Sequence, residues 1–184
     1  QKLRTDRWGA FEFSTNGTYM FTLRQANFPG DRNVSYLGKF WPSGFPIQNT
    51  GFPRLRGNAS VDWDWKSFGA SLSLNHSGGF LEDVDRGSTA NNPNPGSLDF
   101  TPRTVVSNAQ GFPLSGVREV RAINTVDVQL RWTIPWTKTR LAAGANNVFD
   151  EAPPFVPTSF ESNIDRRLAD LRGRFYYVRL TQEF

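Results

Sequence analysis

The stretch LRGNASVDWDWKSFGASLSLNHS, residues 55–77, alternates apolar and polar side chains on both sides of the dipeptide Lys66–Ser67. Before the dipeptide the larger apolar groups take odd positions, while Asp62 and Asp64 take even ones. After it the apolar groups take even positions. A period of two is typical of a β-strand, and a two-residue connection is typical of a tight hairpin. We therefore predict two antiparallel strands joined at Lys66–Ser67.

The same alternation in other segments predicts an all-β, antiparallel fold with about six strands. These strands are expected near residues 8–25, 54–65, 68–82, 117–134, 138–148 and 172–184, with long loops over 27–53, 83–115 and 150–170. In their most regular parts, one parity carries no Asp, Glu, Lys or Arg, although charged residues make up 21% of the chain. The opposite parity carries Arg56, Asp62, Asp127, Arg131 and Arg179, among others. One face of the predicted sheet therefore excludes charge.

The composition of the 184 residues excludes several classes of function. The chain has 21 Lys and Arg and 17 acidic residues, without a basic run, so we do not expect nucleic-acid binding. It has no Cys, which excludes disulfides, thiolate metal sites and a Cys nucleophile. The only His, His76, lies on the charge-free parity without evident partners for a metal site or a catalytic triad. We expect no enzymatic activity, cofactor or metal site.

Three features favour a membrane wall over a soluble sheet. Short connections, Lys66–Ser67 and residues 135–138, alternate with long loops, so that all the long loops fall at one end of the sheet. Strands of about 9–11 residues are long enough to cross a bilayer when tilted. Large aromatic residues gather at the short-turn end, as in a membrane girdle: Trp8, Trp63, Trp65, Phe68, Trp132, Trp136 and Phe184. Together these features predict an antiparallel transmembrane β-barrel segment in a bacterial outer membrane.

Four stretches carry a resemblance to a known family. The segments NNVFDEAPPF (146–155) and DLRGRFYYVRLTQEF (170–184) resemble the carboxyl end of TonB-dependent outer-membrane receptors, and FEFSTNGTYM (11–20) and residues 51–80 look like earlier strands of the same barrels. Two positions depart from the usual pattern of these receptors. Gln182 stands where an aromatic or aliphatic residue is usual, and Ala169 stands where a Tyr is common. The resemblance implies that residues 1–184 are the carboxyl-terminal part of a larger, 22-stranded barrel.

The resemblance also implies a function and partners. Such receptors take up a scarce nutrient, such as a siderophore, haem, cobalamin or an oligosaccharide, with energy supplied by a TonB-type coupling protein. The expected partners are outer-membrane lipid and lipopolysaccharide, the remainder of the barrel and its plug, and the barrel-assembly machinery. Two alternatives stay open: a porin-like outer-membrane barrel and a soluble, carbohydrate-binding β-sandwich.

Candidate binding residues lie in the loops and on the polar parity. The mouth candidates for substrate binding are Trp41, Phe45, Asp83, Asp85 and Phe112. We favour packing of the loop aromatics on one another over contact with a substrate. For the acidic cluster Glu82, Asp83 and Asp85, we favour a solvated loop over a site for a divalent ion or a cationic ligand. We expect the lumen-facing charges Arg56, Asp62, Asp127, Arg131 and Arg179 to pair with each other or with a plug. We treat the four N-glycosylation patterns, at Asn16, Asn33, Asn58 and Asn75, as coincidental, because most fall within predicted strands.

Overall fold

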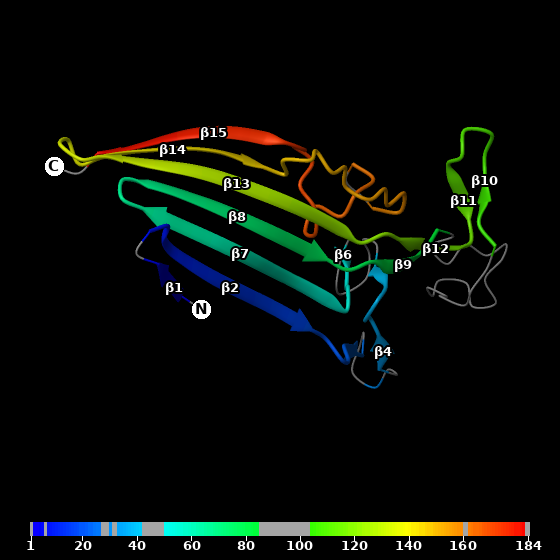
Figure 1. Ribbon diagram of the computed structural model, residues 1–184. Coiled ribbons are helices and arrows are strands. Elements are labelled where there is room, and N and C mark those ends of the chain that lie inside the picture. The colour runs from blue at the N-terminus through cyan, green and yellow to red at the C-terminus, as the bar shows by residue number, and fades with distance from the viewer. Residues whose placement is uncertain are drawn as a thin grey trace.

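The main element of the fold is an open, antiparallel sheet of seven strands, in the order β1-β2-β7-β8-β13-β14-β15 (Figure 1). The computed structural model describes residues 2–5, 7–26, 30, 33–41, 50–84, 104–159 and 162–182. The strands are β1 (Lys2–Thr5), β2 (Gly9–Tyr19), β7 (Leu55–Trp65), β8 (Phe68–Ser77), β13 (Ile123–Ile134), β14 (Thr139–Asn146) and β15 (Phe175–Gln182). The predicted all-β, antiparallel class is confirmed. In the described parts, no helix is long and apolar enough to span a membrane.

Several expected strands are shorter than the alternation suggested. The segment 8–25 divides into β2 and β3 (Arg24–Gln25), and β3 pairs with β4 (Val34–Ser35) instead of joining the main sheet. The segments 68–82 and 117–134 each break at two residues, 78–79 and 121–122, and the two backbones approach closely there. A Cβ on Gly79 would lie 2.5 Å from the carbonyl oxygen of Val120. Beyond the breaks, β9 (Phe80–Asp83) pairs with β12 (Val117–Val120).

The edge strand β1 was not predicted, because four residues carry too little alternation to be recognised. It pairs antiparallel with β2 and forms one edge of the main sheet, and β15 forms the other edge. Two further short pairs lie outside the main sheet. They are β5 (Phe40–Trp41) with β6 (Thr50–Gly51), and β10 (Val106–Ser107) with β11 (Pro113–Ser115).

The turns and the loops separate to opposite ends of the sheet, as Figure 1 shows. At one end, β7 and β8 meet through Lys66 and Ser67, and Lys66 adopts a left-handed backbone with φ 54°. At the same end, residues 135–138 join β13 to β14. At the other end, long connections follow β2, β8 and β14. We call these the short-turn end and the loop end.

The register places the charge-free parity of every strand on one face of the sheet. One row of cross-strand neighbours on this apolar face is Phe13, Val61, Leu72, Val128, Ala145 and Tyr176. Its side chains are not covered by any second layer in the described residues. Leu130 is 67% exposed and Val178 is 75% exposed. The sheet is therefore a single layer with an exposed apolar face.

The hydrophobic core lies at the loop end instead of against the sheet. Phe40, Phe80, Val120 and Val156 form a buried cluster, and Leu168 packs against it. The rings of Phe40 and Phe80 stack with centroids 5.8 Å apart. We call this unit, built from residues 36–41, 50–52, 80–83, 117–120, 154–159 and 162–168, the loop cap.

Candidate functional site

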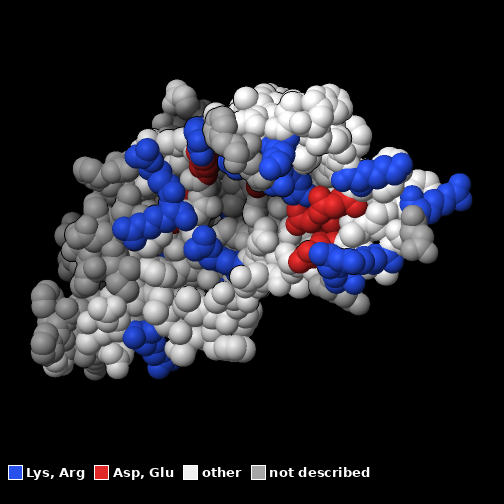
Figure 2. Space-filling view, turned by 90° about the vertical axis from the view of Figure 1, so that its left-hand side faces the viewer, with Lys and Arg blue, Asp and Glu red and all other residues white. Residues whose placement is uncertain are grey.

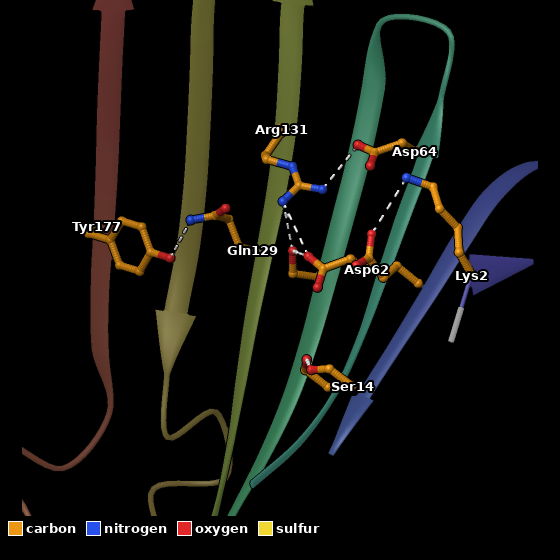
Figure 3. Close-up of polar contacts among 10 residues, drawn as sticks. Lys2, Ser14, Asp62, Asp64, Gln129, Arg131 and Tyr177 are labelled. Atoms are coloured by element: carbon orange, nitrogen blue, oxygen red, sulfur yellow. Dashed lines mark hydrogen bonds and ion pairs between the residues drawn. The ribbon is translucent and has the colours of Figure 1, made fainter. Parts of the chain in front are cut away.

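The polar face of the sheet carries a charge network near the short-turn end (Figure 3). Arg131 on β13 reaches across β8 to β7, where its guanidinium lies 3.4 Å from Asp62 and 3.1 Å from Asp64. The same guanidinium donates to the Ser71 hydroxyl at 2.9 Å, and Ser71 donates to Asp62 at 2.5 Å. One cation therefore links three neighbouring strands.

Two glycines make room for long side chains that lie across this face. A Cβ on Gly69 would meet the Arg131 guanidinium at 2.9 Å and the Asp64 carboxylate at 2.7 Å. A Cβ on Gly144 would meet the Tyr177 ring at 2.6 Å. Tyr177 accepts a hydrogen bond from Gln129 at 2.8 Å across β14 (Figure 3). The small residues thus let side chains bridge strands that are not adjacent.

At the exposed rim of this region, an ion pair joins β1 and β2. Lys2 lies 3.6 Å from Glu12, and both side chains are more than half exposed. Viewed from the short-turn end, most of the visible acidic side chains gather in one patch with Lys and Arg around it (Figure 2). The mixture of both signs favours pairing within the sheet, as expected for Asp62 and Arg131. No ion pair of Arg56 or Arg179 occurs among the described residues.

An amide row crosses the polar face closer to the loop end. Asn16, Asn58 and Asn75 are direct cross-strand neighbours on β2, β7 and β8, and Thr125 on β13 continues the row. The Asn58 side chain donates to the side-chain oxygen of Asn75 at 2.9 Å, and the Asn75 side chain donates to the Asp127 carboxylate at 2.9 Å. The three asparagines are also the first residues of three of the glycosylation patterns. These repeated patterns are the sequence signal for the row, although they carry no information on the register that brings the three residues together.

Asp127 connects the amide row to the turn that follows β14. Its other carboxylate oxygen accepts from the backbone of Asn147 at 2.8 Å. Asn147 has φ 51°, and its side-chain amide bonds both the N–H and the carbonyl of Glu151 at 2.9 Å. Asn147 and Glu151 of the segment 146–155 thus have a structural role, since Asn147 holds the turn against β13 and Glu151.

A cleft of about 640 Å³ opens over the amide row. The row forms its floor, together with Thr18 and Arg56, and the segment 168–175 forms one wall. Within that wall Arg172 binds Asp170 at 2.5 Å, which lowers the pKa of the Asp170 carboxyl. Phe175, 41% exposed, stands at the end of the cleft.

Two buried carboxylates hold the loop cap together. Glu82 has no exposed side-chain surface and accepts from the Thr158 backbone at 2.8 Å and hydroxyl at 2.6 Å, while Arg118 approaches it at 3.4 Å. Asp165, 3% exposed, accepts from the Gly51 backbone at 2.5 Å. Burial raises the pKa of Asp165, against the lowering effect of its hydrogen bonds. These contacts join the β14–β15 connection to β6 and β9.

The expectation of a solvated acidic cluster at the loop end is wrong for the two members that the structure describes. Glu82 is fully buried and Asp83 is 2% exposed, because the β14–β15 connection packs over β9. Asp85 lies outside the described residues. In the described parts, no group of three or more His, Cys, Asp or Glu is placed to hold a metal ion.

The aromatic mouth candidates divide by their burial. Trp41 is 3% exposed inside the loop cap, where its ring lies 4.3 Å from that of Tyr36, so it packs on the loops themselves. Phe112 is 41% exposed and contacts Phe155 edge to face. Phe45 lies outside the described residues. Of the aromatic and acidic candidates, only Phe112 is therefore described with substantial exposed surface.

The girdle candidates lie together at the short-turn end. Trp8 and Trp136 are 64% and 79% exposed, and Phe68 stacks on Trp132 with centroids 6.3 Å apart. Trp63 and Trp65 also stack, and the Trp63 indole donates to the backbone oxygen of Trp8 at 2.7 Å. Phe184 lies outside the described residues.

Comparison of the chain with protein-family models, with curated proteins and with solved structures finds no match.

Proposed function

We propose that this chain forms part of the wall and the outer mouth of a TonB-dependent outer-membrane receptor. Such a receptor takes up a scarce nutrient, with energy supplied from the inner membrane by a TonB-type coupling protein. The observation that carries the proposal is the single-layer sheet, with one exposed face free of charge and one polar face. A soluble sheet of this size covers its apolar face with a second layer. Lipid supplies that cover for a barrel wall.

The exposed aromatic side chains at the short-turn end of the sheet indicate how the sheet would be oriented in the membrane. Trp at the boundary between hydrocarbon and water places its ring in the apolar region and its N–H near water. Trp8 and Trp136 are exposed at the short-turn end and would occupy this level, with the short-turn end facing the periplasm. The loop cap would then lie on the outer surface.

The two open edges support the proposed partners. Unpaired backbone groups in hydrocarbon cost several kcal/mol each, so β1 and β15 require further strands within a membrane. The remainder of a barrel would supply these strands, with help from the barrel-assembly machinery. The charge network around Arg131 would face the lumen and its plug.

The assignment to receptors of the TonB-dependent kind rests on the resemblance of residues 146–155 and 170–184. A porin-like barrel would share the same wall physics, and it is the second candidate. The soluble, carbohydrate-binding sandwich is less favoured, since it would need a layer over Leu130 and Val178 that the described residues do not provide.

The test is fractionation of the native cells, followed by the intact mass and the heat-modifiability of the polypeptide that carries this sequence. We expect it in detergent-solubilised outer membranes, with faster electrophoretic migration before heating than after. A mass several times 20.8 kDa would support a single-chain receptor with a plug. Recovery in aqueous buffer without detergent would overturn the membrane assignment, and an outer-membrane protein without a plug-sized domain would favour the porin.

A further inference from the structure

We infer that the cleft over the amide row binds a neutral, hydroxyl-rich ligand, of the oligosaccharide class. This inference rests on the proposed function, because it takes the polar face as the lining of a transport path. It goes beyond it by choosing one class of cargo. The choice depends on the side chains of the floor, on the charge balance of the cleft and on its single aromatic residue.

The floor offers donors and acceptors in equal measure. Each amide carries an acceptor oxygen and an N–H₂ donor, and each sugar hydroxyl is both donor and acceptor. Successive amides on adjacent strands stand about 4.8 Å apart, a spacing on the scale of one sugar ring. Asn16, Asn58 and Asn75 therefore present a repeating surface to a repeating ligand.

The row is ordered before any ligand arrives. Asn75 is held between Asn58 and Asp127, and Asp127 is held by the backbone of Asn147. These bonds fix the direction of the amides, which reduces the entropy lost on binding. At the other end of the row, Asn16 is exposed, and its side-chain amide has no hydrogen-bond partner among the described residues. Its amide is available to a ligand.

The charges of the cleft do not favour an anion. Three acids line it, Asp127, Glu151 and Asp170, against Arg56 and Arg172. Arg172 is held by Asp170, so Arg56 is the one lining Arg without an ion pair in the described parts. A site for a ferric chelate with several carboxylates needs an excess of positive charge. This cleft has none.

An aromatic ring completes the site. Phe175 neighbours Asn146 across β14 and β15, so both lie on the polar face. The Arg172 guanidinium lies 5.1 Å from the centre of the Phe175 ring, which helps to hold the ring in place. Apolar faces of sugar rings pack on such rings while their hydroxyls bond to polar neighbours.

Titration calorimetry on the detergent-solubilised protein from native outer membranes tests the inference. The probes are maltoheptaose, xylohexaose and cellohexaose, which are neutral and differ in linkage, and ferric citrate as the anionic chelate. We expect at least one oligosaccharide to bind and ferric citrate not to bind. Asn16→Ala and Asn58→Ala should each weaken binding about tenfold, or roughly 1.4 kcal/mol.

Gln129→Ala is the matched control, because it removes an amide from the same face outside the cleft. It should leave the affinity within about twofold of the parent. The inference is overturned if no oligosaccharide binds, if ferric citrate binds instead, or if Gln129→Ala weakens binding as much as Asn16→Ala. Heat-modifiability of each variant shows that it is folded. If the protein is absent from the outer membrane, the proposed function is refuted. If it is in the outer membrane but binds none of the oligosaccharides, only this inference is refuted.

Discussion

The sheet and the loop cap are held together by different forces. The sheet depends on backbone pairing between long strands, and many apolar side chains on one of its faces are open to the surroundings. The loop cap has short strands, yet it buries Phe40, Phe80, Val120 and Val156 around an apolar centre. Of the two regions, only the loop cap packs its apolar side chains into a buried core, as water-soluble domains do. This difference is what we expect if the sheet lies in a membrane, as proposed, and the cap lies in water.

The largest expected effect is a core deletion in the loop cap. Phe80→Ala removes a ring that packs between Phe40 and Val120, and such deletions cost about 3–5 kcal/mol. Hydrogen exchange should show faster exchange of cap amides, such as that of Phe52, while the amides of β13 stay protected. Phe68→Ala is the control, since its ring is 52% exposed at the short-turn end. Equal loss of protection in both regions would show that cap and sheet unfold as one unit.

A charge on the apolar face should have the next largest effect. Leu130→Arg places a guanidinium where we propose lipid, at a cost of about 2–4 kcal/mol near the bilayer midplane. We expect less heat-modifiable, folded protein in the outer membrane. Gln129→Arg, at the neighbouring position on the polar face, should assemble normally. Normal yield of the Leu130→Arg variant would contradict a lipid-facing role for this face.

The loop cap should also respond to pH, through Asp165. Burial raises the pKa of its carboxyl above the ordinary value of 3.8, so the folded cap binds more protons than the unfolded cap between the two values. Stability from this group is therefore complete below 3.8 and is lost as pH rises through the raised pKa. Cap amides should exchange faster across this window, after correction for intrinsic rates. Asp165→Asn should remove the dependence, and a parent cap insensitive to pH would contradict the expectation.

The smallest effect is expected at the exposed rim of the sheet. Lys2→Ala breaks the ion pair with Glu12, whose two side chains are 54% and 60% exposed. Surface pairs of this kind contribute about 0–1 kcal/mol. Thermal unfolding in detergent should shift little, and less still in high salt. A shift as large as that of Phe80→Ala would mean that β1 holds the sheet edge far more firmly than its length suggests.

Sequence patterns suffice for features that depend on near neighbours in the chain. The hairpin at Lys66–Ser67 could be predicted, since period-two alternation on both sides specifies the strands and the short gap specifies the turn. The breaks at Gly79 and beside Val120 were missed, because they lie where two segments far apart in the sequence meet. The burial of Glu82 was missed for a similar reason. Its partner Thr158 lies 76 positions away in the chain.

Some features of the candidate site could be predicted from the sequence, and others could not. Alternation alone placed Asp62 and Arg131 on one face, because side-chain direction in a strand is set by parity. The amide row was visible only as scattered patterns at Asn16, Asn58 and Asn75. Register brought them side by side, and the cleft over them needed the β14–β15 connection to fold back.

The sequence by itself determined the longer strands, their two unlike faces and the short turns, because these depend on neighbours a few residues apart. The tertiary structure alone decided which rows align, where the core lies and which polar groups meet. Those features depend on contacts between distant segments, such as Asp165 with Gly51 and Asn75 with Asp127. No local periodicity encodes them, since their free energy arises only when the chain brings those segments together.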